Sequence, residues 1–189
     1  MVAVVGLRTK RSRIITGVVS VLVLVFVGFS VRLFVLPDLN APERSNAIVM
    51  LGGNGVGPFD EAVALAHQGW APNVVFSLTP YQTCDPSIVH LPPFHLPRKD
   101  RVFCFQADPR TTQGEARAIA HLAALHHWDR VIVVMPTTQA TRARLRIGRC
   151  YPGQILEVGV TPPGFWAWIR GITYEWPALF KALALQPGC

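Results

Sequence analysis

The chain has 189 residues, of which 50% are hydrophobic and 15% charged, so it can form one ordinary domain with a short appendage. Its formal net charge is +7, but five basic and no acidic residues lie in the first 36 positions, and the remainder carries 13 Lys and Arg against 11 Asp and Glu. A net charge of +2 is too small for a nucleic-acid-binding surface, and we expect no nucleic-acid partner.

The first predicted element is a transmembrane helix. Ile14–Val31 is an uncharged run of 18 residues, about 27 Å long as a helix, and it extends to Leu36 if Arg32 turns its head group towards water. We divide the chain into a basic N-terminus (1–13), a transmembrane helix (14–36), a linker (37–45) and an α/β domain (46–189). The basic residues before the span predict a single-pass protein of the cell membrane with a cytoplasmic N-terminus and an extracytoplasmic domain. A cleaved signal peptide is the alternative.

Short β-branched apolar runs alternate with amphipathic stretches after the linker. This alternation predicts an α/β class, a Rossmann-like three-layer domain with a mostly parallel sheet. The expected strands are Ala47–Leu51, Asn73–Leu78, Val102–Phe105, Val131–Met135 and Ile155–Val160. The expected helices are Phe59–Gln68, Thr112–His126, Thr138–Arg149 and Phe165–Leu185, the last interrupted at Pro177.

A glycine-rich loop follows the first expected strand. Gly52, Gly53 and Asn54 lie where backbone N–H groups and the next helix N-terminus can approach an anion. The pattern matches neither the dinucleotide fingerprint nor the Walker loop. A tight structural turn is therefore an equally good explanation.

Four cysteines follow the predicted span and indicate two disulfides in an oxidising compartment. We favour Cys84–Cys104, which would close the proline-rich loop Thr79–Arg101 over a site, and Cys150–Cys189, which would hold the C-terminal segment. Free thiols are the alternative. No residues have the spacing of a metal site, so we expect no metal, and no cofactor is indicated.

Thr112 and Glu115 begin the second expected helix of the domain. Their S/T-x-x-E spacing is that of a capping box, in which both side chains only satisfy the helix N-terminus. The other interpretation is that both side chains face a ligand at the edge of the sheet.

Gln139 and Arg142 lie in the first turns of the helix after the fourth expected strand. An arginine beside the carboxyl ends of parallel strands suits a phosphate or carboxylate. Arg142, Arg146 and Arg149 share one helix face. For Arg144, Arg146 and Arg149 we favour a solvated basic face.

The order of these motifs resembles the YdcF/SanA-like family of bacterial proteins, in an actinobacterial-looking branch. The match consists of a strand ending in L-G-G at Gly53, the segment Ala62–Ser77, the helix start Thr112–Ala116 and the R-A pair at Arg142. The resemblance implies a Rossmann-like domain, often membrane-anchored, with proposed roles in the cell envelope or cell wall.

The resemblance also implies a candidate site for a small phosphorylated or nucleotide-like ligand. Its residues would be Gly52, Gly53, Thr112, Glu115 and Arg142. Where the family commonly has an arginine this chain has Pro58–Phe59, and where it has a histidine this chain has Gln139. Glutamine does not titrate near neutral pH, so these departures leave enzymatic activity open. A non-catalytic interaction domain in an envelope complex is the alternative function.

The last expected helix is rich in aromatic residues: Phe165, Trp166, Trp168, Trp176 and Phe180. Core packing is the ordinary explanation for such residues. The alternative is an amphipathic helix face that lies on the membrane.

Overall fold

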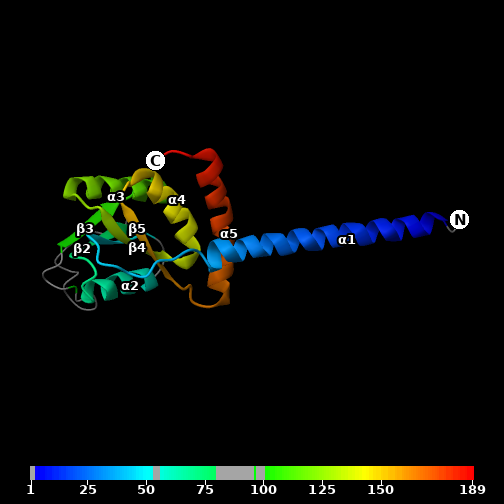
Figure 1. Ribbon diagram of the computed structural model, residues 1–189, viewed down its shortest axis with the longest axis horizontal. Coiled ribbons are helices and arrows are strands. Elements are labelled where there is room, and N and C mark those ends of the chain that lie inside the picture. Colours follow the sequence, from blue (N-terminus) through cyan, green and yellow to red (C-terminus); the bar gives the residue numbers. More distant parts are fainter. Residues whose placement is uncertain (1–2, 53–55, 80–95, 97–100) are drawn as a thin grey trace.

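The computed structural model describes residues 3–52, 56–79, 96 and 101–189. Within these residues the core is a five-stranded, all-parallel sheet with the order β3-β2-β1-β4-β5 (Figure 1). The strands are β1 (Ala47–Met50), β2 (Asn73–Leu78), β3 (Arg101–Gln106), β4 (Arg130–Pro136) and β5 (Gln154–Val160). The predicted α/β class is confirmed, and the sheet is wholly rather than mostly parallel.

Helices cover both faces of the sheet, as the alternating pattern predicts. The helical elements are α1 (Ala3–Ser30), its π-helical continuation η1 (Val31–Val35), α2 (Val56–His67), α3 (Thr112–His126), the 3₁₀ turn η3 (Thr137–Gln139), α4 (Ala140–Cys150), α5 (Phe165–Phe180) and the π-helical turn η4 (Lys181–Leu185). Figure 1 shows α3 and α4 on one face and α2 on the other. Successive strand residues point to opposite faces, so Val49 and Val133 pack with α3 and α4 while Ile48 and Ile132 pack with α2.

The long first helix is the only described segment that is long and apolar enough to cross a membrane, by length and composition. This stretch is Ser12–Val35, with 24 residues and a mean hydropathy of 2.7. It coincides with the predicted span to within two residues at its N-terminal end and one at its C-terminal end. Most of the helix projects away from the sheet, with the N-terminal end farthest from it (Figure 1).

One predicted disulfide, Cys150–Cys189, is present, with the Cα atoms 4.9 Å apart. It holds the last residues beside α3, where Arg117 donates a 2.7 Å hydrogen bond to the carbonyl oxygen of Cys189. The other predicted pair includes Cys84, which lies outside the described residues, as does most of the predicted loop Thr79–Arg101. None of the described cysteines is a free thiol.

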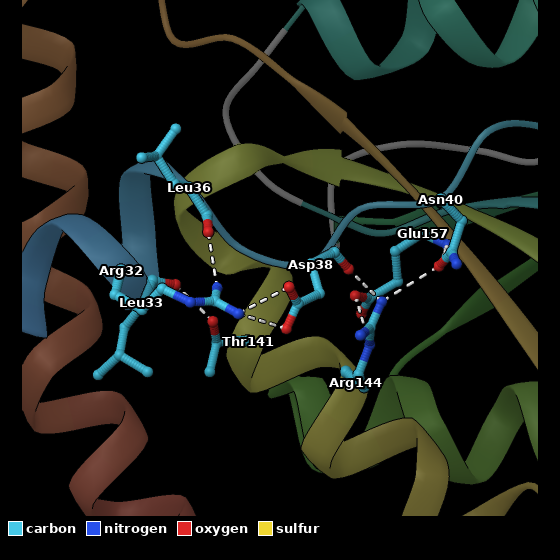
Figure 2. Close-up of polar contacts among 8 residues, drawn as sticks. All are labelled: Arg32, Leu33, Leu36, Asp38, Asn40, Thr141, Arg144 and Glu157. Carbon is cyan, nitrogen blue, oxygen red and sulfur yellow. Dashed lines mark hydrogen bonds and ion pairs between the residues drawn. The ribbon is translucent and has the colours of Figure 1, made fainter.

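A polar clamp, made by Arg32, Asp38, Asn40 and Arg144, holds the segment after the apolar helix against the domain (Figure 2). Arg32 donates to both carboxylate oxygens of Asp38, at 2.7 Å each. Arg144 of α4 donates to the carbonyl oxygen of Asp38 and, at 3.1 Å, to the side chain of Asn40. The predicted linker is therefore fixed on α4 rather than extended freely between helix and domain.

Glu157 of β5 lies beneath this clamp and is fully buried. Its Oε2 is 2.9 Å from Nε of Arg144, yet neither carboxylate oxygen accepts a well-directed hydrogen bond from the described residues. Burial raises the pKa of Glu157 to about 7, although Arg144 opposes the shift. The ion pair thus compensates the charge only in part.

We expect the domain to lose stability as Glu157 ionises. Because its pKa rises from 4.5 in the unfolded chain to about 7 in the folded one, the native state binds the extra proton. The free energy of unfolding should therefore fall by about 3 kcal/mol between pH 4.5 and 7.5 from this group alone. Chemical unfolding of the full chain in detergent, with Glu157→Gln as comparison, isolates the effect. A stability difference between the two proteins that does not change with pH would contradict it.

Candidate functional site

A cavity lies where the strand order of the sheet reverses. β1 has β2 on one side and β4 on the other, and open α/β sheets bind ligands beyond the carboxyl ends of such strands. The cavity has a volume of about 590 Å³, which is in the usual range for small-molecule sites. Its walls come from the carboxyl ends of the strands, the first turns of α3 and α4, and one side of α5.

Five of the predicted ligand-binding residues meet in this cavity: Gly52, Thr112, Glu115, Gln139 and Arg142. They come from four separate segments, the loop after β1, the start of α3, the turn η3 and the first turn of α4. The expectation that these segments converge at one sheet edge is therefore met. The other two predicted residues, Gly53 and Asn54, lie outside the described residues.

The start of α3 is not the capping box that its spacing allows. Thr111, not Thr112, is the N-cap residue, and its side chain accepts a hydrogen bond from the backbone N–H of Gly114. The hydroxyl of Thr112 instead accepts a hydrogen bond from Arg142. Thr112 and Glu115 are both buried at the cavity wall. The capping-box interpretation is thus wrong, and both side chains are oriented across the sheet edge.

Glu115 joins α3 to the loop after β1. Its Oε1 accepts a 2.6 Å hydrogen bond from the backbone N–H of Gly52. A Cβ atom at position 52 would lie 3.1 Å from both this oxygen and Oγ of Ser77, so glycine permits the close approach. Burial raises the pKa of Glu115, while hydrogen bonds from Ser77 and Gly52 oppose the shift. The cavity therefore contains a carboxyl group that can carry a proton above its ordinary pKa.

Arg142 is paired inside the protein. Its Nε and one terminal nitrogen donate to the two carboxylate oxygens of Glu175, at 2.6 and 2.7 Å. Burial disfavours the guanidinium charge, but the hydrogen bond and charge of Glu175 outweigh burial and raise the pKa of Arg142. The guanidinium also lies 5.8 Å from the ring centre of Tyr174. Arg142 thus anchors α5 to α4 in addition to lining the cavity.

Glu175 is not among the site residues predicted from the sequence. A usable signal was present, because Glu175 is the only acidic residue in the predicted helix Phe165–Leu185. An isolated carboxylate in an apolar helix is rarely buried without a partner. A basic partner on another helix was therefore to be expected.

Of the two buried basic groups of the cavity, Arg142 and Arg146, only Arg146 has no carboxylate partner among the described residues. It is buried, and its two terminal nitrogens donate to the backbone and side-chain oxygens of Gln186, which are neutral. Burial lowers the pKa of Arg146, and the nearby charges of Arg149, Arg142 and Arg117 lower it further. This wall of the cavity is electropositive.

The predicted solvated basic face on α4 is wrong for Arg146, which is buried, whereas Arg144 and Arg149 are partly exposed. Arg146 lines the cavity, Arg149 donates a 2.7 Å hydrogen bond to the carbonyl oxygen of Ala182, and Arg144 pairs with Glu157. All three side chains therefore bind oxygen atoms of neighbouring segments. The shared face of Arg142 and Arg146 is confirmed, since both line the same cavity.

The charged residues of the cavity are unbalanced. Among the described residues, four basic residues line it, namely Arg110, Arg142, Arg146 and Lys181, against the two acidic residues Glu115 and Glu175. Arg110 and Lys181 are exposed, whereas the others are buried. The excess of positive charge persists when Glu115 is ionised and increases when it is protonated.

Gln139 occupies the turn between β4 and α4 and is buried. Its side-chain amide lies 3.4 Å from Oγ1 of Thr112, at the far limit of a hydrogen bond. It can donate or accept a hydrogen bond at the cavity wall but cannot exchange a proton near neutral pH. Among the described lining residues, Glu115 is then the one carboxyl group that has no ion-pair partner.

In comparisons with family models, curated proteins and solved structures, nothing matches the chain.

Proposed function

We propose that this chain is a membrane-anchored α/β protein of the cell envelope that binds a small anionic, phosphate-bearing ligand at the carboxyl edge of its sheet. The envelope role follows the resemblance to YdcF/SanA-like proteins. The ligand class follows the charge and position of the cavity. Chemical conversion of the bound molecule would require a side chain of the same cavity that can exchange a proton.

The membrane anchor is supported by the way the apolar helix ends. Phe34 is fully buried, and Thr141 of α4 donates a hydrogen bond to the carbonyl oxygen of Leu33. A cleaved signal peptide would have no reason to pack its last turn into the mature domain. The basic residues before the span favour a cytoplasmic N-terminus, and the Cys150–Cys189 disulfide favours an oxidising space for the domain.

The single observation that carries the ligand class is the environment of Arg146. A buried guanidinium ordinarily has a carboxylate or another anion beside it, because burial of an uncompensated charge is costly. Arg146 binds only neutral oxygens of Gln186 among the described residues. A phosphate group in the cavity would supply the missing charge and could also accept hydrogen bonds from Gln139 and the free N–H groups of Arg142.

Thermal unfolding of the full chain in a non-ionic detergent tests this function. The panel contains inorganic phosphate, pyrophosphate, nucleoside mono- and diphosphates, a prenyl pyrophosphate and S-adenosylmethionine. A ligand that binds only the native state raises the midpoint of unfolding. Loss of one charge-assisted hydrogen bond costs about 1.5–3 kcal/mol, so Arg146→Gln should weaken the best ligand roughly tenfold to a hundredfold.

Arg149→Gln is the matched control. Arg149 lies on the same helix and binds the carbonyl oxygens of Ala182 and Gln186, but it does not line the cavity. Its replacement should therefore leave ligand affinity unchanged. No midpoint shift with any member of the panel, or equal weakening by both substitutions, would defeat the proposed ligand class.

A non-catalytic interaction domain is the second candidate, and Gln139 is the observation that favours it. The residue occupies the cavity position where the YdcF/SanA-like resemblance implies a histidine, and it cannot serve as a general acid or base. Restoring the histidine with Gln139→His distinguishes the two functions. New turnover of a bound ligand would indicate a degenerate enzyme, whereas recovery of one consistent protein by crosslinking in membranes would favour the interaction domain.

A further inference from the structure

The C-terminal helix leaves an unusual number of large apolar side chains uncovered. Phe165, Trp166, Phe180, Leu183 and Leu185 of α5 and η4 are each more than half exposed. The opposite side of the same helix packs on the domain through Leu179 and Ala182, which are buried. The C-terminal segment therefore combines buried apolar side chains with large apolar side chains that stay more than half exposed.

The uncovered helix contacts the end of the membrane anchor directly. The ring of Trp176 stacks on Phe26 at 5.0 Å and meets the edge of Phe34 at 5.4 Å. Its indole N–H donates a 3.0 Å hydrogen bond to Oγ of Ser30. In Figure 1 α5 runs crosswise to α1, with the domain on one side of it and the free length of α1 on the other. A helix crosswise to a membrane-spanning helix lies along the plane of the membrane.

The crossing point is at the depth of a bilayer surface. Trp176 meets α1 around Ser30, which is 18 residues beyond Ser12, the start of the apolar stretch. At 1.5 Å per residue this distance is about 27 Å, close to the roughly 30 Å thickness of the hydrocarbon core. If Ser12 lies at one boundary of the hydrocarbon, α5 lies at the other.

The polar groups of α5 suit the same position. The exposed charged residues of α5 and η4 are Arg170 and Lys181, which are both basic, and the only acidic residue, Glu175, is buried against Arg142. The hydroxyl of Thr173 donates to the carbonyl oxygens of Ile169 and Arg170 in the preceding turn, so it needs no water. Tryptophan and phenylalanine facing lipid with basic residues near the head groups is the pattern of an interfacial helix.

We propose that α5 is a second membrane contact, an interfacial helix that lies on the outer surface of a bilayer with anionic lipid head groups. This inference rests on the proposed anchor, because α1 defines the direction of the membrane. The clamp of Arg32, Asp38, Asn40 and Arg144 fixes the end of α1 on the domain, so anchor and helix act as one unit (Figure 2). Since Tyr174 of α5 and Lys181 of η4 line the cavity, the ligand site lies beside the proposed membrane contact.

Spin labels on the full chain test the contact in vesicles of phosphatidylcholine and phosphatidylglycerol. Single cysteines replace Phe180 on α5, Val21 in the middle of the apolar stretch and Leu125 on α3, all of which are more than half exposed. Accessibility of each nitroxide is measured with oxygen, which concentrates in lipid, and with a water-soluble nickel chelate. The unsubstituted chain serves as the labelling control, since its described cysteines are not free.

The label at position 180 should shift towards oxygen, as the label at 21 does, while the matched apolar position 125 stays accessible to the nickel chelate. If the label at position 180 is as accessible to the nickel chelate as the label at 125, while the label at 21 is still in lipid, the interfacial helix is contradicted. The membrane anchor would not be affected by that result. Nickel accessibility at 21 would overturn the anchor and, with it, the inference drawn from it. In either case the ligand-binding test above is unaffected, because it is performed in detergent.

Discussion

Replacing Glu175 by alanine is expected to lower the free energy of unfolding by about 3–5 kcal/mol, because it leaves the buried guanidinium of Arg142 without its carboxylate. The pair is bidentate, with contacts of 2.6 and 2.7 Å, and both side chains are almost fully shielded from water. It also joins α4 to α5 through two hydrogen bonds. Chemical unfolding of the full chain in detergent measures the loss.

Asp38→Asn is the control for this prediction. Asp38 makes an equally short ion pair with Arg32, but both partners are exposed to water, and such pairs contribute little to stability. The double substitution Arg142→Met, Glu175→Leu should recover much of the stability lost with Glu175→Ala, since it removes both buried charges. Equal losses from Glu175→Ala and Asp38→Asn would show that the buried pair does not hold α5 in place.

Gly114→Ala is expected to be the most damaging glycine-to-alanine change among the described glycines, with a loss of about 3 kcal/mol or more. A Cβ atom there would lie 2.0 Å from the carbonyl oxygen of Pro109 and 2.7 Å from the carbonyl carbon of Asp108. Both atoms belong to the backbone, so neither can rotate away. The first turn of α3 would have to shift, and it carries Thr112 and Glu115 into the cavity.

Gly148→Ala is the matched substitution, since Gly148 lies in α4 and its nearest neighbour to an added Cβ is Ile155, at 4.0 Å. Alanine favours a helix over glycine by about 1 kcal/mol, so this variant should unfold at the same or a higher midpoint. Thermal unfolding of both variants separates backbone collision from helix propensity. Similar midpoints for the two would contradict the packing described at Gly114.

The fold was predictable because its signal is local. β-branched runs such as Val131–Met135 are long enough for a strand and too short for a membrane helix, and their alternation with amphipathic stretches predicts a parallel sheet. Once the sheet is parallel, the carboxyl ends of its strands share one edge. That rule placed Gly52, Thr112 and Arg142 together without any knowledge of the loops between them.

The partners of these residues were less predictable, because they depend on contacts across the sequence. Thr111 and Thr112 are chemically identical candidates for the helix cap, and only the path of the chain before them decides which one takes the role. Glu175 lies 33 positions from Arg142, and no periodic pattern connects them. The burial of Arg146 likewise depends on where the chain after α5 places Gln186.

Which aromatic residues of the C-terminal helix are packed and which are exposed also depends on the segments around the helix, and composition alone does not decide it. Trp176 packs on the end of α1 whereas Trp166 faces outward, although both are aromatic residues of the same amphipathic helix. The sequence left core packing and membrane contact as alternatives. In the structure Leu179 is buried on the domain side of α5 and Trp166 is exposed, so core packing accounts for only part of this helix.

A crystal structure of the full chain grown with pyrophosphate tests the central claim most directly. The account predicts the anion inside the cavity at the carboxyl edge of the sheet, with its oxygens about 2.7–2.9 Å from the guanidinium nitrogens of Arg146. Gln139 and the free N–H groups of Arg142 should complete its hydrogen bonds. An empty cavity with Arg146 still bound to Gln186, or pyrophosphate bound only elsewhere on the surface, would contradict the account.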